Sequence, residues 1–338
     1  MGTQSHPVNP ETPIDLSVVI PVYNEAENLE VLCQEFTGTL AAWGRPFEIL
    51  LVDDGSSDGS FDVLKRLQAA DPRLRVIQFR RNFGQTAAFA AGFAHARGRL
   101  IATADGDLQN DPRDLPAMVE RLDAGEFDIV CGWRKDRKDT FINRRLPSII
   151  ANRLISWATG VRLNDYGCSL KVFRAEVVKP LKLYGEMHRF LPALASEMGV
   201  RIAEQVVNHR ARRFGRTKYG ISRTIRVMLD LVTVKFLLSY STRPLQIFGL
   251  FGSLMGAAGG LILAYLAYVK FAGPEAIGDR PLLLFGILLV FTGVQLLTLG
   301  LLAELQARTY HESQGKPIYV VRQVLESPPP AKTPGTFV

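Results

Sequence analysis

The chain has 338 residues, which is enough for two ordinary domains or for one domain and a membrane anchor. Its composition, with 47% hydrophobic and 22% charged residues, excludes a wholly disordered chain and a fibrous repeat. The formal net charge of +7 is local, because residues 210–243 contain nine basic residues and one acidic residue, so general nucleic-acid binding is not expected.

The N-terminus and the cysteines indicate a cytoplasmic setting. Residues 1–13 are polar, contain proline, and lack the basic and then apolar order of a signal peptide. We therefore expect a flexible N-terminus before a domain that stays in the cytoplasm. Cys33, Cys131 and Cys168 are odd in number and far apart, which predicts reduced thiols rather than a disulfide framework or a zinc site.

Residues 14–220 alternate between apolar strand patterns and helical patterns. Strands are expected at Leu16–Tyr23, Glu48–Val52, Val76–Phe79, Leu100–Ala104 and Asp128–Cys131. Helices are expected at Asn24–Trp43 (where Asn24 and Glu27 resemble a capping box), Phe61–Ala70, Gly84–Ala96 and Leu115–Ala124. Connections of this length place neighbouring strands in parallel, so the pattern predicts an α/β domain with a mostly parallel sheet.

The basic region continues into residues 221–243, which are apolar with intermittent charges. Arg223, Arg226 and Asp230 fall on one helical stripe, which predicts an amphipathic helix lying on a membrane surface. Its basic residues are expected to bind anionic lipid headgroups, at about 1 kcal/mol for each residue.

Two uncharged runs within residues 244–304 predict a membrane hairpin. Residues 245–269 and 282–303 would each exceed the hydrocarbon core of about 30 Å as helices, whereas two buried helices of a soluble core rarely lack charge for so long. The basic segment precedes the first span, so the positive-inside rule predicts a multi-pass protein of the inner (plasma) membrane with the α/β domain and both termini cytoplasmic. The tail, residues 305–338, is Pro-rich beyond Ser327 and is expected to be disordered there.

Glycines recur every four residues in the first span, at Gly252, Gly256 and Gly260. This spacing places them on one helical face, where another helix could approach closely, so a homo-oligomer is one expectation. A loosely packed, glycine-rich span is the alternative.

Three polar motifs follow expected strands, where open α/β sheets bind ligands. They are PVYNE (21–25), DDGSSDGS (53–60) and ADGDLQNDP (104–112). Carboxylates gathered at one edge repel one another, and their hard oxygen atoms favour Mg²⁺ or Mn²⁺ as the partner. There is no GxGxxG after the first strand and no GxxxxGK[ST] loop, which disfavours dinucleotide and ATP sites.

The order of the motifs PVYNE, VDDGSSDGS, RNFGQTAA, DGDLQNDP and CGWR resembles the family-2 glycosyltransferases of the GT-A fold. The later NDYGCSLKVFR and RRFGRTKYG motifs, followed by two membrane spans, are similar to the polyprenyl-phosphate branch of that family. The resemblance runs from about Leu16 to Gln323. It implies a Rossmann-like sheet and inverting transfer of a sugar from a UDP- or GDP-linked donor to a polyprenyl phosphate such as undecaprenyl phosphate.

The resemblance also implies roles for individual residues. Contacts to the nucleotide sugar are expected from Pro21, Tyr23, Glu25, Val52, Asp54, Asp105, Gly106, Asp107, Arg212 and Lys218. The metal, Mg²⁺ or Mn²⁺, is expected on Asp107 and Gln109. The acceptor phosphate is expected to contact Arg134, Arg144 and Ser148, and the catalytic residues are expected to be Asp105, Asp107 and Arg134.

Other polar residues have simpler interpretations. Asp58 is expected to cap a helix, and Asp165 is equally compatible with a ligand and a structural role. His188 has no triad context, and none is needed, because a phosphate acceptor is already ionised at neutral pH.

Two further functions compete with this one. A processive polysaccharide synthase would carry a QxxRW element, which is absent because Trp occurs only at positions 43, 133 and 157. A non-catalytic membrane scaffold would not need the intact Asp105, Asp107, Gln109 and Arg134.

Overall fold

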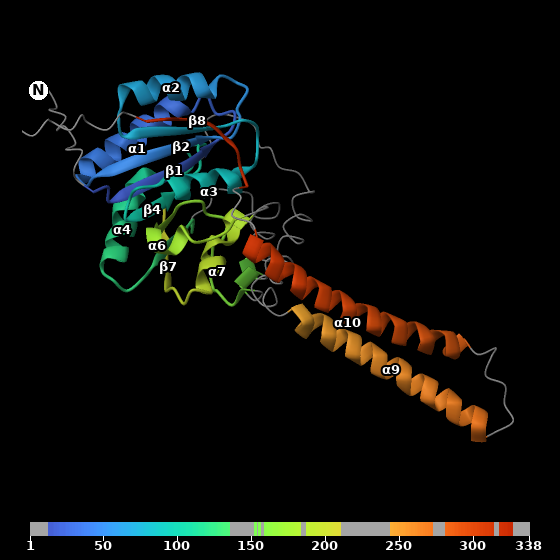
Figure 1. Ribbon diagram of the computed structural model, residues 1–338. Coiled ribbons are helices and arrows are strands. Elements are labelled where there is room, and N and C mark those ends of the chain that lie inside the picture. The colour runs from blue at the N-terminus through green and yellow to red at the C-terminus, as the bar shows by residue number, and fades with distance from the viewer. Residues whose placement is uncertain are drawn as a thin grey trace, which may run out of the picture. The chain divides into compact units, whose positions relative to one another are not determined.

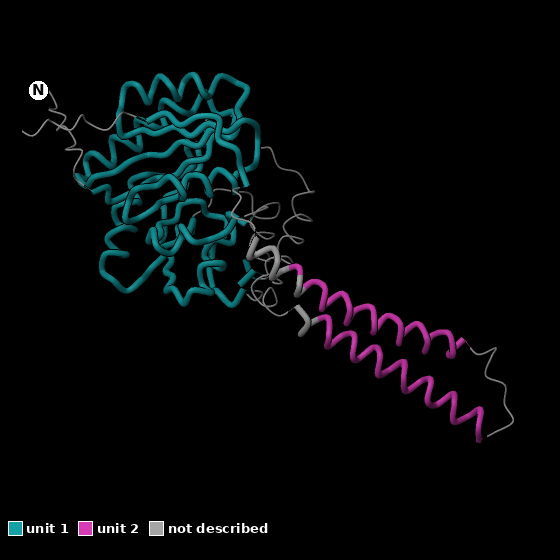
Figure 2. The backbone as a smooth tube through the Cα atoms, in the orientation of Figure 1, with its two compact units in different colours: residues 1–231, 317–338 teal, residues 232–316 magenta. Residues whose placement is uncertain are grey.

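The computed structural model describes residues 13–135, 152–153, 155–156, 159–183, 187–210, 244–272, 281–313 and 318–326. The chain divides into two compact units, coloured teal and magenta in Figure 2. The first unit comprises residues 1–231 and 317–338, and the second comprises residues 232–316. The expected amphipathic helix at 221–243 and the tail after Ser327 lie outside the described residues.

The first unit is built on an eight-stranded sheet with the order β7-β5-β6-β4-β1-β2-β3-β8 (Figure 1). Its strands are β1 (Leu16–Val22), β2 (Phe47–Asp53), β3 (Leu74–Phe79), β4 (Leu100–Thr103), β5 (Ile129–Trp133), β6 (Lys171–Arg174), β7 (Ile202–Val206) and β8 (Val321–Leu325). The central order β4-β1-β2-β3 is parallel throughout. The expected mostly parallel sheet is therefore confirmed, while β6 and β8 add antiparallel strands that the sequence analysis missed.

Helices pack on both faces of this sheet. They are α1 (Leu29–Trp43), α2 (Ser60–Ala70), α3 (Gln85–His95), α4 (Leu115–Asp123), α6 (Ala175–Val178) and α7 (Leu191–Ser196), with 3₁₀ turns η1 (Pro112–Asp114) and η3 (Met187–Phe190). The expected start of the first helix at Asn24 is wrong. Asn24 has a left-handed φ of 54°, and its N–H and side chain bond to the loop before α2, so the helix begins only at Leu29.

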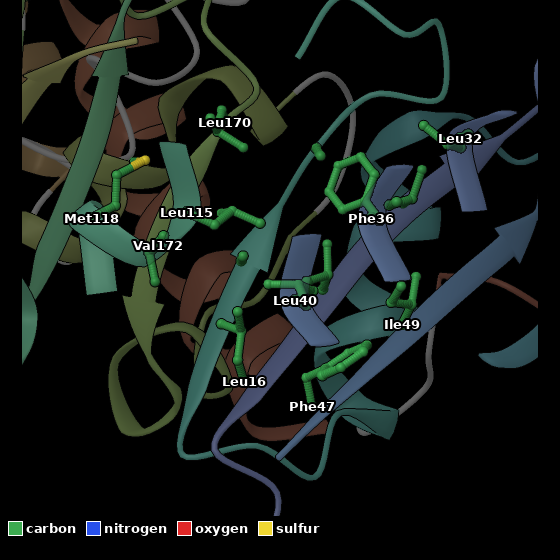
Figure 3. Packing of buried hydrophobic residues seen from close by; sticks show 14 of the residues in the cluster. Leu16, Leu32, Phe36, Leu40, Phe47, Ile49, Leu115, Met118, Leu170 and Val172 are labelled. Atoms are coloured by element: carbon green, nitrogen blue, oxygen red, sulfur yellow. The ribbon is translucent and has the colours of Figure 1, made fainter. Parts of the chain in front are cut away.

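The core explains why the central strands read as continuous apolar runs. One face of the sheet contributes Leu16 and Ile49, which pack with Phe36 of α1 and with Leu115 and Met118 of α4 (Figure 3). The other face is covered by α3, which contacts β1 and β2. Because helices cover both faces of the sheet, the side chains on both faces of β1 and β2 are shielded from water. Both strands are buried along almost their whole length and are therefore mostly apolar.

The last strand of the sheet comes from the far end of the chain. β8 pairs with β3, and Glu326 beside it forms an ion pair with the buried Arg75, whose Nη2 lies 2.9 Å from the Glu326 carboxylate. Tyr319 stacks on Phe79 at 5.2 Å between ring centroids. Residues that were expected to belong to a cytoplasmic tail thus complete the sheet edge, because β3 alone would expose unpaired backbone groups.

The second unit is a pair of long helices, α9 (Pro244–Ala272) and α10 (Pro281–Ser313), shown in magenta in Figure 2. Phe248–Ala272 and Pro281–Ala303 are long and apolar enough to cross a membrane. Only 17% and 11% of their most apolar windows are buried, whereas a core helix of a soluble protein is mostly buried. The expected two-helix hairpin is confirmed, and its apolar surface faces outward.

Glycine permits the close contact between the two helices. A Cβ atom on Gly252 would lie 2.7 Å from the carbonyl oxygen of Gly293, and one on Gly293 would lie 2.8 Å from the backbone nitrogen of Gly256. A Cβ on Gly256 or on Gly260 would have no neighbour within 4 Å among the described residues, so of the three glycines only Gly252 must be small for this helix contact. Gly252 thus serves packing within the hairpin, and the homo-oligomer stays a prediction.

We expect opposite effects from alanine at two helical glycines of the first unit. A Cβ on Gly92 in α3 would lie 2.1 Å from the buried Val19, so Gly92→Ala should destabilise the fold by about 1–3 kcal/mol. Gly38 in α1 has open space, so Gly38→Ala should stabilise it by about 0.5–1 kcal/mol. Thermal unfolding of the full chain in detergent tests both, and a Gly92→Ala protein as stable as wild type would contradict this packing.

Adjacent glycines of α9 provide a second test. A Cβ on Gly259 would lie 2.7 Å from the carbonyl oxygen of Gly286, whereas Gly260 has open space. Gly259→Ala should separate the helices and lower the unfolding temperature of the protein in detergent, and Gly260→Ala should not. Equal unfolding temperatures for the two variants would show that this helix contact is wrong.

Candidate active site

The three polar motifs meet at one edge of the sheet. They follow β1, β2 and β4, which are parallel neighbours, so their carboxyl ends lie together. The register pairs Val22 with Asp53 and Val19 with Thr103. The topology therefore gathers the motifs as the sequence analysis expected, on the side where open α/β sheets bind ligands.

The first two motifs are interlocked by hydrogen bonds. The N–H groups of Asn24 and Glu25 donate to the hydroxyls of Ser56 and Ser60, each at 3.0 Å. In return, the N–H of Ser57 donates to the Asn24 side-chain oxygen at 2.9 Å. These bonds join loops more than 30 residues apart and fix both relative to the strand ends.

The residues expected to contact a nucleotide differ in exposure. Tyr23 is 40% exposed and Pro21 is half-buried, so both present surface at the edge. Glu25 accepts a hydrogen bond from the side-chain amide of Asn28 at 2.5 Å. Val52 is fully buried within β2, so its side chain offers no surface to a ligand.

Asp54 holds the loop that leads into α3. Its two carboxylate oxygens accept hydrogen bonds from the N–H groups of Phe83 at 2.6 Å and Gly84 at 2.9 Å. Burial raises the pKa of Asp54 above its ordinary value, although these two N–H groups oppose the shift. The structure thus gives Asp54 a loop-anchoring role, and its contact with a nucleotide stays a prediction.

The next loop carries two carboxylates that repel each other. Asp105 accepts a hydrogen bond from the side-chain amide of Gln85 at 2.8 Å, and Asp107 accepts one from the N–H of Gln109 at 3.2 Å. Burial, followed by the charge of Asp107, raises the pKa of Asp105, and the positive charge of Arg134 is among the influences that oppose the increase. A positive charge bound at this edge of the sheet would therefore stabilise the two ionised carboxylates.

Asn110 fixes the shape of this loop. Its side-chain oxygen accepts hydrogen bonds from the N–H of Asp105 at 2.8 Å and from the hydroxyl of Ser169 at 3.0 Å. A Cβ on Gly106 would lie 3.2 Å from the carbonyl oxygen of Pro21, so the small residue lets the loop approach the first motif. The sequence analysis did not single out Asn110 or Ser169, although Asn110 lies inside a recognised motif.

Arg134 lies just beyond β5 and pairs with Asp165. Its Nε and Nη2 donate to the two oxygens of Asp165 at 2.7 and 2.9 Å. Burial would lower the pKa of Arg134, but the hydrogen bond to Asp165 and the negative charges of Asp165 and its neighbours together raise it, so the guanidinium stays charged. The structure thus gives Asp165 a structural contact, as the ion-pair partner of Arg134, and a ligand role is not tested.

A second polar pair was not expected from the sequence. Thr86, next to Gln85 at the start of α3, forms a hydrogen bond of 2.9 Å with His188 Nδ1. Since residues 86 and 188 come from distant segments, only the fold brings them together. The other expected phosphate contacts, at Arg144, Ser148, Arg212 and Lys218, lie outside the described residues.

The oxygen atoms near Asp107 have the chemistry of a hard-metal site with few protein ligands. Asp107 and Gln109 offer carboxylate and amide oxygens two residues apart. Among the described residues, no group of three His, Cys, Asp or Glu side chains is arranged to hold a metal ion.

Asp111 ties this loop to the segment that precedes residue 211. It is buried, and its carboxylate lies 2.6 Å from Arg113 Nη2 and 2.7 Å from Arg210 Nη2. The side-chain amide of Asn208 also donates to it, at 2.9 Å. Burial would raise the pKa of Asp111, but these partners outweigh burial and hold the pKa well below its usual value.

Comparisons with known proteins agree with this arrangement. The family model described as Glycosyl transferase family 2 matches residues 17–181. Dodecaprenyl-phosphate galacturonate synthase of Rhizobium johnstonii is 47% identical over 94% of this chain and 95% of its own length. Undecaprenyl-phosphate 4-deoxy-4-formamido-L-arabinose transferase of Salmonella dublin is 39% identical over 95% of this chain and 96% of its own length.

Solved structures share the fold. Glucosyl-3-phosphoglycerate synthase of Mycobacterium tuberculosis, solved with Mn²⁺, UDP and phosphoglyceric acid, aligns with a TM-score of 0.53. Its identity is 18%, and the alignment covers 66% of this chain and 78% of that one. At this identity the likeness shows a common fold and nothing further.

The depressed pKa of Asp111 predicts how stability depends on pH. A carboxyl whose pKa is lower in the folded state stabilises the protein above its unfolded pKa of about 4, and this contribution is lost as the pH falls. Asp111→Asn should therefore be less stable than wild type at pH 7, with the difference narrowing below about pH 4. Thermal unfolding across pH tests this, with the exposed Asp62→Asn as control. A difference that does not vary with pH would contradict the assignment.

Proposed function

This chain belongs to glycosyltransferase family 2, and we propose that it transfers a sugar from a nucleotide sugar to the phosphate of a polyprenyl phosphate. The identity with curated relatives along nearly the whole chain confirms the family expected from the motifs. The observation that carries the reaction is the pair Asp105 and Asp107, placed by β4 at the ligand-binding edge of the sheet.

For the substrates, we propose a galacturonate donor and a long-chain polyprenyl phosphate acceptor. Of the two curated relatives compared above, the one that makes a galacturonate lipid has the higher identity. The arabinose derivative of the other relative is the second candidate. The assay described below, which varies the nucleotide sugar, decides between UDP and GDP.

We propose that a divalent metal, Mg²⁺ or Mn²⁺, binds at Asp107 and Gln109. The donor set fits, because hard oxygen atoms are present, and burial followed by the charge of Asp107 raises the pKa of the neighbouring Asp105. The small number of protein ligands suits an ion completed by water and phosphate oxygens. When bound, such an ion neutralises the charge of a diphosphate leaving group.

The protein's own residues bind and orient the two anionic substrates. An ionised phosphate oxygen of the acceptor attacks the anomeric carbon, the bond from that carbon to the nucleotide diphosphate breaks, and the configuration inverts. No general base is needed. Arg134 supplies positive charge for the phosphates, and Asp54, through Phe83 and Gly84, fixes the loop that presents Gln85 to Asp105. Orientation and electrostatic stabilisation are the main contributions.

The acceptor lipid requires a membrane. We propose that α9 and α10 span it, with the catalytic unit and both termini in the cytoplasm. The apolar, outward-facing surface of these helices and the nine basic residues of 210–243 support this orientation. Two spans, a missing QxxRW element and a polyprenyl-phosphate relative of the same length disfavour a processive synthase.

The proposal is tested with the purified full-length protein. The protein is incubated with undecaprenyl phosphate, Mg²⁺ or Mn²⁺ and a panel of nucleotide sugars that includes UDP-galacturonate, and lipid products are identified by mass. We expect a singly glycosylated polyprenyl phosphate that disappears with chelator and returns with metal. Transfer of no sugar in the panel would overturn the proposal.

The role of Asp107 has a separate test. Asp107→Asn should reduce transfer by more than about 100-fold, because the proposed metal would lose its carboxylate ligand while the side chain keeps its size. Asp62→Asn on the exposed face of α2 is the control and should retain activity. Near-normal transfer by Asp107→Asn would show that the metal assignment is wrong.

A further inference from the structure

The ion pair between Arg134 and Asp165 is more extensive than a surface salt bridge. Asp165 accepts three hydrogen bonds from Arg134: from Nε at 2.7 Å, from Nη2 at 2.9 Å and from the backbone N–H at 3.3 Å. Asp165 is buried, and Arg134 is mostly so. Because a guanidinium is planar, a two-pronged contact fixes the direction in which its remaining nitrogen points. That nitrogen is Nη1, which Asp165 does not hold.

The fold places this guanidinium at the catalytic edge. β6 lies between β4 and β5 and is antiparallel to both, so β4 and β5 run in the same direction. Arg134 after β5 therefore emerges at the same edge as Asp105 after β4. The two side chains interact electrostatically, since the charge of each affects the pKa of the other.

Asp165 is itself held by the neighbouring strand. Glu204 on β7 accepts hydrogen bonds from the N–H groups of Asn164 at 2.8 Å and Asp165 at 3.2 Å. Its other oxygen accepts the Asn164 side-chain amide at 2.7 Å. A chain of contacts thus runs from β7 through the 164–165 turn to Arg134.

We propose that Asp165 is a positioning residue for the transfer reaction, and that it acts by aiming Arg134 at the substrate phosphates. This inference rests on the proposed function. Without Asp165, the carboxylates Asp105 and Asp107 would compete for the guanidinium and draw it away from a productive direction. Asp165 does not itself touch the reacting groups. Its effect on the rate should therefore exist only while Arg134 is present.

This dependence separates positioning from a purely structural role. An Asp165 that only stabilised its turn would lower activity by the same factor whether or not Arg134 is present. An Asp165 that works through Arg134 would have no further effect once the guanidinium is removed. A double-mutant cycle measures this difference directly.

The experiment measures kcat and KM for both substrates in the full-length wild type, Asp165→Asn, Arg134→Gln and the double variant. We expect Asp165→Asn to lower kcat by about 10- to 100-fold with a smaller change in the KM of the nucleotide sugar. In the Arg134→Gln background, the same substitution should change kcat less than about 3-fold. An equal loss in both backgrounds would overturn the proposal.

Two further variants keep the test decisive. Asp128→Asn, at the opposite end of β5, removes a carboxylate that pairs with Arg174 and Arg201, and it should leave kcat and KM near wild type. If Asp165→Asn does not fold, Glu204→Gln is used instead, because Glu204 holds the turn that carries Asp165. The loss of kcat caused by Glu204→Gln should also vanish in the Arg134→Gln background. Transfer by the wild type establishes the proposed function independently of how the cycle turns out.

Discussion

Electrostatic repulsion at one edge of a parallel sheet is the constraint on which the rest of the site depends. The loop after β4 carries both Asp105 and Asp107, and burial of Asp105 beside the charge of Asp107 disfavours the ionised form of Asp105. Arg134 opposes part of that charge within the protein, and the proposed metal would oppose more. A site that binds a diphosphate and a lipid phosphate at once needs an excess of positive charge, and the proposed metal on Asp107 and Gln109 would supply it.

The loops around this edge show how the protein limits movement there. The motifs after β1 and β2 bond to each other, Asp54 fixes the loop before α3, and Asn110 fixes the loop after β4. Asn24, Asp54 and Asn110 therefore form hydrogen bonds to neighbouring loops, and these bonds fix the shape of the edge. Such bonds hold the donor groups in place before the substrates arrive, which is how a site without a general base can lower a barrier.

Much of this could be predicted from sequence, because the signals were local. Apolar runs predicted the central strands, polar motifs predicted where ligands would bind on the sheet, and uncharged runs predicted α9 and α10. The failures share one cause, which is contact between distant segments. The local sequence predicts a helix start at Asn24, but in the structure Asn24 bonds to Ser56 and Ser57 instead. The role of Asp165 depends on Arg134 after β5 and Glu204 on β7, which lie far from it in the sequence.

The position of β8 in the chain has a consequence for biosynthesis. Residues 321–325 are translated only after both α9 and α10, yet they form the outer strand of a sheet whose other strands are complete by residue 206. A nascent chain that ends before residue 321 therefore leaves β3 uncovered and Arg75 without Glu326. Completion of the sheet therefore requires the chain to return to β3 after both long helices have been translated.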